Sequence, residues 1–155
     1  MARKMTALAG LLLMAALILL AVLLNRTGKL LEQADIPWRD VRGILVSETW
    51  TDGLNYTDGY DWAILRVRKD FTPPDSWTNT TATLQEINPA IPGQSRHYFA
   101  PSFYNNELLP AAFTAWLYIP HDDADPFGQR AWFAAMYDED SGILALYRGH
   151  DLWGF

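Results

Sequence analysis

The chain has 155 residues and a formal net charge of −6, and from Ile36 onward eight Lys and Arg residues stand against sixteen Asp and Glu, a net charge of −8. Phosphates repel a surface of this sign, so we expect no nucleic-acid partner. The absence of cysteine excludes disulfides, a thiol nucleophile and a lipid anchor attached to cysteine.

An apolar segment near the start, residues 5–24, contains no charged residue. As a helix it would extend roughly 30 Å, the thickness of the hydrocarbon layer of a bilayer. A cleaved signal peptide is the alternative, but its apolar part is typically about 7 to 15 residues long and ends in small residues. Val22, Leu23 and Leu24 stand where those small residues belong. We therefore predict an uncleaved anchor that contacts membrane lipid through residues 5–24.

The charges that flank this segment bear on its orientation, because Lys and Arg favour the cytoplasmic side. Arg3 and Lys4 precede the segment, and Arg26 and Lys29 follow it, so the side chains alone do not decide. The amino terminus adds one positive charge to the first flank. We therefore expect a single-pass protein whose C-terminal part is periplasmic or extracellular.

The boundary between anchor and domain is expected near Pro37, because proline ends a helix and restricts the preceding residue. Residues 25–35 are polar but compatible with helix, and they can extend the membrane helix by a turn or two. The predicted organisation is a membrane anchor at 1–24, a juxtamembrane linker at 25–36 and an exported globular domain at 37–155.

Beyond Pro37 the apolar residues alternate in the manner of strands. The last strand pair is joined by Asp138-Glu139-Asp140-Ser141-Gly142, which is typical of a hairpin turn. One short helix fits within Asp75–Ile87, where Asp75 or Ser76 can cap it. We predict a small α+β or mostly β domain with an antiparallel sheet and a C-terminal β-hairpin. The expected strands are 43–50, 61–71, 111–119 and the two arms of 130–149.

The stretch 50–62, WTDGLNYTDGYDW, contains Thr-Asp-Gly twice among aromatic residues. The interpretation that we favour is structural: Asp-Gly forms tight turns, and the aromatic rings pack on the core. The alternative is a ligand site whose aromatic faces hold a glycan or whose oxygens, including those of Asn55 and Asp61, hold calcium. The candidate ligand-binding residues are Trp50, Asp52, Tyr56, Asp58, Tyr60 and Trp62.

The segment 150–155, HDLWGF, contains three large apolar side chains. Its large side chains either close the core of the domain or bind a partner, and packing into the core is the more usual fate of such residues. The candidate partner-binding residues are Leu152, Trp153 and Phe155.

Signatures of catalysis are weak. The three histidines lack the spacing of a helical metal site, and Gly93–His97 lacks the second glycine of a nucleophile elbow. A Ser-His-Asp set assembled in space remains open, since such triads follow no fixed order in the chain. We therefore predict no metal, no cofactor and a membrane-tethered interaction or accessory protein with a protein partner at the membrane surface. The alternative is a glycan- or calcium-assisted ligand-binding module that uses the 50–62 loop.

Overall fold

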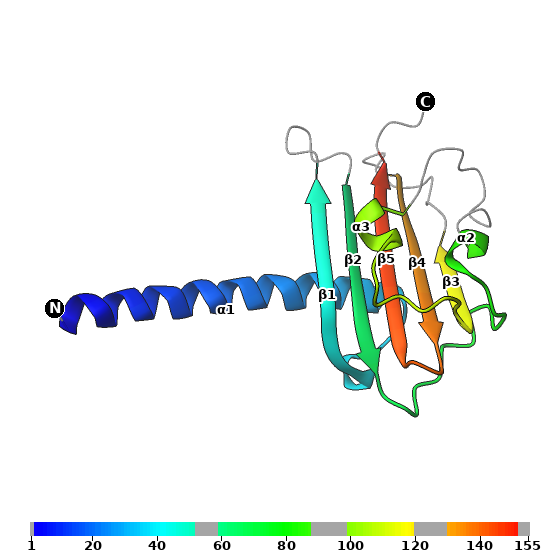
Figure 1. Cartoon of the computed structure of the whole chain (residues 1–155), viewed down its shortest axis with the longest axis horizontal. Coiled ribbons are helices and arrows are strands. Elements are labelled where there is room, and N and C mark those ends of the chain that lie inside the picture. The colour runs from blue at the N-terminus through cyan, green and yellow to red at the C-terminus, as the bar shows by residue number, and fades with distance from the viewer. Residues whose placement is uncertain (1, 52–58, 88–98, 120–129, 152–155) are drawn as a thin grey trace.

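A computed structural model of the chain describes residues 2–51, 59–87, 99–119 and 130–151, and it shows a long N-terminal helix joined to a five-stranded domain (Figure 1). This confirms the predicted fold class, including the antiparallel sheet and the C-terminal hairpin. The elements in chain order are α1 (Ala2–Gln33), the 3-10 helix η1 (Trp38–Asp40), β1 (Val41–Thr51), β2 (Gly59–Val67), α2 (Leu84–Ile87), α3 (Pro101–Tyr104), β3 (Ala115–Ile119), β4 (Arg130–Asp138) and β5 (Ile143–Asp151).

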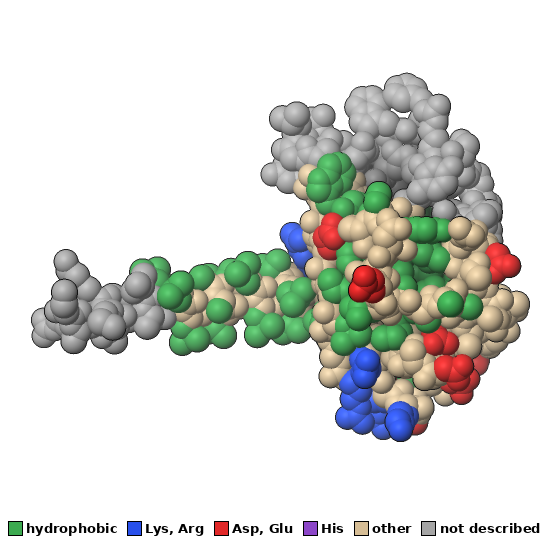
Figure 2. Space-filling view, viewed as in Figure 1, with side chains coloured by type: hydrophobic (Ala, Val, Ile, Leu, Met, Phe, Trp, Pro, Cys, Tyr) green, Lys and Arg blue, Asp and Glu red, His purple; other side chains and the backbone are tan. Residues whose placement is uncertain are grey.

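Helix α1 has two parts with different surroundings. Between Gly10 and Leu24 its side chains are exposed except for a half-buried Leu23, and they form the apolar rod that projects from the domain (Figure 2). The helix is long and apolar enough to cross a membrane. From Thr27 onward side chains on one side of the helix are buried against the sheet, Leu30 and Leu31 among them.

The end of α1 is a well-defined cap. Asp35 adopts a positive φ of 58°, the left-handed conformation that commonly follows the last helical residue. The amide of Ile36 donates to the carbonyl of Leu31 at 2.9 Å, and the amide of Asp35 donates to that of Glu32 at 3.1 Å. This pair of bonds is the Schellman arrangement, and Pro37 follows directly.

The predicted linker 25–36 therefore differs from what the structure shows. Residues 25–33 continue α1 without interruption, and Leu30, Leu31, Ala34 and Ile36 belong to the core of the domain. The segment is helical, as its sequence indicates. It is not a linker, however, because it packs against the sheet. The physical reason is that its apolar residues recur on one side of the helix and cover the sheet.

The strands form one antiparallel sheet in the order β1-β2-β5-β4-β3. The β4–β5 hairpin turns at Gly142, whose φ is +66°, and the amide of Gly142 donates to the carbonyl of Asp138 at 3.0 Å. The glycine matches the turn predicted from the sequence, since a residue with a side chain is strained at this φ. The last described strand, β5, lies in the middle of the sheet between β2 and β4 (Figure 1).

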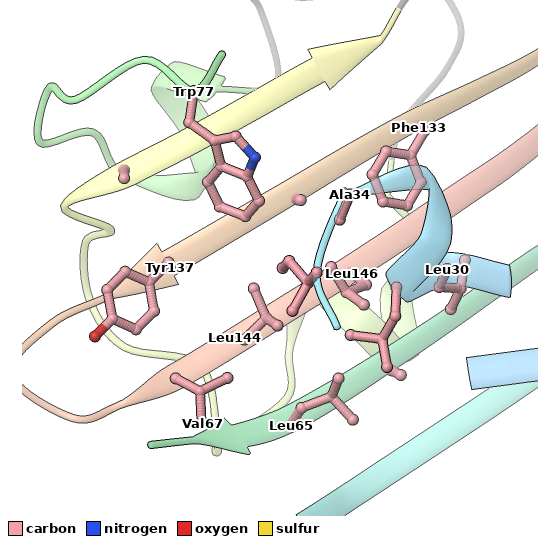
Figure 3. Close-up of a cluster of buried hydrophobic side chains, with 14 residues drawn as sticks. Leu30, Ala34, Leu65, Val67, Trp77, Phe133, Tyr137, Leu144 and Leu146 are labelled. Atoms are coloured by element: carbon pink, nitrogen blue, oxygen red, sulfur yellow. The ribbon is translucent and has the colours of Figure 1, made fainter. Parts of the chain in front are cut away.

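Both faces of the sheet are covered, because alternate side chains of each strand point to opposite faces. On one face Leu65, Leu144 and Leu146 pack against Leu30 of α1 and against Ala34, which directly follows the helix (Figure 3). On the other face the short helices α2 and α3 and the segment before β3 supply the cover. Their buried residues there are Ile87, Phe103 and Phe113.

Two predicted strands have different bounds in the structure: the strand predicted at 111–119 begins only at Ala115, and the one predicted at 61–71 is Gly59–Val67. The short helix expected within 75–87 is Leu84–Ile87. Thr83 caps that helix instead of Asp75 or Ser76. The hydroxyl of Thr83 accepts the amide of Glu86 at 3.3 Å, and the carboxylate of Glu86 accepts the amide of Thr83 at 2.8 Å, which is a capping box.

Candidate functional site

A row of aromatic rings crosses one face of the sheet, with one ring from each strand. Trp50 of β1 stacks on Tyr60 of β2 with ring centroids 5.9 Å apart, and Tyr60 stacks on Tyr147 of β5 at 6.1 Å. Tyr147 stacks on Trp132 of β4 at 5.0 Å, and Trp132 lies 6.4 Å from Tyr118 of β3. Trp50 and Tyr60 are directly opposite in the register, whereas the other pairs are diagonal neighbours.

The middle of this row depends on Gly149. A Cβ atom at this position would lie 2.3 Å from Nε1 of Trp132 and 2.6 Å from Cε2 of the same ring. The indole therefore lies flat over the backbone of the neighbouring strand, a place that only glycine leaves open. Trp132 and Tyr147 are both buried, so this part of the row belongs to the core.

The β1 end of the row is exposed and carries a carboxylate. Trp50 is 49% exposed, while Tyr60 is half-buried beneath it. The Tyr60 hydroxyl donates to Oε1 of Glu48 at 2.6 Å, and the Ser102 hydroxyl of α3 donates to the same oxygen at 3.1 Å. Burial, reinforced by the hydrogen bond to Glu48, raises the pKa of the Tyr60 hydroxyl. Tyr60 consequently remains a neutral donor that fixes the carboxylate next to the exposed indole.

An ion pair lies on the opposite face of the same strands. Arg148 of β5 donates through Nη2 to Oδ2 of Asp61, and the Thr49 hydroxyl donates to Oδ1 at 2.7 Å. Asp61 is almost fully buried. Its carboxylate is therefore engaged on both oxygens and points away from the face that carries Tyr60 and Trp62.

The structure brings only part of the predicted ligand site together. Trp50 and Tyr60 lie side by side at the exposed end of the row. Trp62 is 1% exposed and packs edge-on against Phe103 at 5.4 Å, so it is a core residue. The period-two pattern explains this, since Trp62 points to the face that α3 covers.

Several predicted residues lie outside the described part of the chain: Asp52, Tyr56, Asp58, Leu152, Trp153 and Phe155. Among the residues that the structure does describe, no group of three or more His, Cys, Asp or Glu side chains is placed to hold a metal ion. Asp61, one of the oxygen donors considered for calcium, is bound to Arg148 instead.

Two residues of the exposed cluster were missed by the sequence reasoning. Glu48 stands two positions before Trp50, and the strand period places both on one face, so alternation alone identifies it as a neighbour. Ser102 lies 54 positions away in the sequence from Glu48, and nothing local indicates their contact.

Two open hollows of the described region lie at the other end of the sheet. They share Tyr137 and Glu139, and one of them is also lined by Arg66 and Lys69. Because both are open and neither includes a residue of the Glu48 cluster, they do not extend the candidate site.

Comparison with known proteins does not place the chain in a family: no family model matches it, and no curated protein or solved structure is significantly similar. The function of the chain is therefore inferred from its own geometry.

Proposed function

We propose that this chain is a single-pass membrane protein whose exported five-stranded domain serves as an interaction or accessory module without catalytic activity. The observation that supports this most strongly is the continuity of α1. The exposed apolar part up to Leu24 and the buried residues Leu30 and Leu31 belong to one uninterrupted helix. The helix that enters the bilayer is thus also part of the core of the domain.

This continuity has a mechanical consequence. A flexible tether raises the effective concentration of a domain near the membrane but leaves its orientation open. Here the last turns of α1 pack on β2 and β5, so the sheet is held at a fixed height and a fixed angle to the helix. A module mounted in this way presents the same surface to a neighbouring membrane protein at all times.

The proposed orientation places the amino terminus in the cytoplasm and the domain outside. The amino terminus, Arg3 and Lys4 place three positive charges before the apolar segment, whereas Arg26 and Lys29 place two after it. This difference favours the proposed arrangement. Labelling of intact cells tests it: a single cysteine introduced at an exposed domain position, Thr80→Cys, is expected to react with a reagent that cannot cross membranes. Reaction only after lysis would reverse the orientation.

The accessory role is tested by purifying the full-length protein from its native membrane in mild detergent and identifying chains that accompany it. We expect a stoichiometric partner. The matched variants carry an insertion between Leu24 and Asn25, either a flexible Gly-Ser segment or a helical Ala-rich segment of two full turns. If fixed orientation matters, the flexible insertion loses the partner and the helical insertion weakens binding less. Recovery of the chain alone would count against the proposal.

A second candidate function is favoured by one specific observation, the exposed Trp50 ring that stacks on Tyr60 beside the carboxylate of Glu48. A flat aromatic face next to a hydrogen-bond acceptor is suited to a sugar ring. Trp50→Ala is then expected to abolish retention on a glycan array with little change in stability. Trp62→Ala, the buried control, is expected to lower stability by about 3 to 5 kcal/mol. Unchanged retention by Trp50→Ala would remove this candidate.

A further inference from the structure

The position of β1 relative to the membrane end of α1 carries a further inference. Figure 1 shows α1 passing behind the strands and leaving the sheet on the side that β1 borders. The strands run across the direction of the helix, so β1 lies between the rest of the sheet and the apolar part of α1.

The position of β1 along the axis of α1, which we call its height, follows from the spacing of the strands and from the contact between helix and sheet. The buried turn around Leu30 and Leu31 packs on β2 and β5. Neighbouring strands are roughly 4.8 Å apart, so β1 lies roughly 5 to 7 Å closer to the amino-terminal end of the helix. At about 1.5 Å per residue this corresponds to about four residues and places β1 level with Arg26. Leu24, where the apolar segment ends, is only about 3 Å further along.

An independent contact places the segment that leads into β1 within about 3 Å of this position along α1. Trp38, at the start of the segment that leads into β1, packs on Gly28 of α1, where an added Cβ would lie 3.4 Å from the indole Nε1. Gly28 is four residues beyond Leu24, a rise of about 6 Å. The headgroup layer on each side of a bilayer is roughly 5 to 7 Å thick, and Trp is enriched at this depth. Trp38 is 43% exposed, as expected for a side chain in contact with lipid headgroups.

The two edges of the sheet are protected differently. At the β3 edge, the segment 78–82 pairs with the strand and with the residues before it: Thr78 exchanges backbone hydrogen bonds with Trp116, and Ala82 does so with Phe113. No described residue pairs with the outer edge of β1, although β1 has 11 residues. Long open edges invite association with other chains and are normally covered.

The exposed side chains near this edge suit a lipid surface. Leu45, which lies at a register shift of β1, is 39% exposed. Four basic residues of this region are exposed: Arg26, Lys29, Arg39 and Arg42. With the acidic Glu32, Asp35 and Asp40 they give residues 26–42 a net charge of +1, whereas the chain from Ile36 onward carries −8. Cationic side chains beside exposed apolar ones are typical of proteins that contact the headgroup layer.

We propose that the outer edge of β1, together with Trp38, rests in the headgroup layer of the membrane that α1 spans, so that lipid covers the edge that the protein leaves open. This inference rests on the proposed function, since it requires α1 to cross the bilayer. It makes the domain a body seated on the membrane surface, with the aromatic row running away from the lipid.

The absence of native cysteine allows a direct test. Full-length Leu45→Cys carries a nitroxide label at the β1 edge, and Thr80→Cys carries it beside the β3 edge as the matched control. Both are reconstituted in vesicles of equal parts phosphatidylcholine and phosphatidylglycerol, and collisions with oxygen, which favours lipid, are compared with collisions with a water-soluble nickel chelate. Arg42→Cys is a second label on the same edge should the first variant fold poorly. Circular dichroism and resistance to alkaline extraction are measured for each.

We expect the ratio of oxygen to nickel collisions to be at least severalfold higher at residue 45 than at residue 80. Equal ratios in a chain that resists alkaline extraction would overturn the seating while leaving the anchor intact. Exclusion of both reagents with spin–spin broadening would show a second copy on the edge and would also overturn it. Extraction by alkali would refute the anchor and the seating together.

Discussion

The contact between α1 and the sheet makes a quantitative prediction for Leu30→Ala. Leu30 is 1% exposed and lies among Leu65, Leu144 and Leu146 in the core (Figure 3). Removing three carbon atoms loses about 2.4 kcal/mol at about 0.8 kcal/mol per methylene. The cavity that remains raises the expected loss to about 3 kcal/mol. This is a large part of the roughly 5 to 15 kcal/mol that stabilises a typical domain.

The assay is urea unfolding of the full chain in detergent micelles, followed by near-ultraviolet circular dichroism of the domain. Leu20→Ala is the matched control, because Leu20 lies on the same helix and is exposed. We expect the control to leave the midpoint unchanged, since a side chain in detergent or lipid gives little to the packing of the domain. Equal stability of the two variants would show that the end of α1 does not support the sheet, and it would refute the fixed mounting proposed above.

Three further substitutions test other parts of the structure. Gly149→Ala should lower the free energy of unfolding by about 2 to 3 kcal/mol, because its Cβ would overlap the Trp132 indole; the same change in a Trp132→Leu background should cost clearly less, and an equal cost would refute the overlap. Burial raises the pKa of Tyr147, so the unfolded chain loses this proton first and stability should fall as the pH rises above 10.0, the ordinary tyrosine value. The stability of Tyr147→Phe, measured by denaturant titration at increasing pH, should fall less steeply than that of the unsubstituted chain. Parallel curves for the two chains would contradict this. Gly28→Ala should stabilise the chain by about 0.5 to 1 kcal/mol, because the methyl group makes ordinary contact with Trp38 and alanine favours helix; a loss of stability would show a tighter contact.

The sequence identifies those features that repeat locally. Alternation in β2 places Ala63, Leu65 and Val67 on one face, and the structure buries all three together. Gly142 marks the turn of the last hairpin because its backbone conformation excludes most other residues. These signals depend only on near neighbours in the chain, so they can be read without knowing the fold.

Features that depend on distant partners were not predictable in this way. The apolar side of 25–36 indicates a helix, but only the sheet, formed later in the chain, decides that this helix is buried. Trp62 resembles Trp50 and Tyr60 in its local pattern, and its burial depends on Phe103, which approaches from α3. The Glu48–Ser102 contact likewise joins segments that no periodicity relates.

The central place of β5 also constrains the order in which the protein can be completed. Strand β5 is the last of the five to be synthesised, yet it pairs with β2 on one side and β4 on the other. Until it has been translated, the β1–β2 hairpin and the β3–β4 pair have no shared hydrogen bonds through the sheet. The pairing of β2 with β5 joins strands that are far apart in the sequence, and such pairing is intrinsically slow. The sheet is therefore completed only when its last strand is made, and a chain that stalls before β5 leaves two strand pairs with open edges, which are prone to associate with other chains.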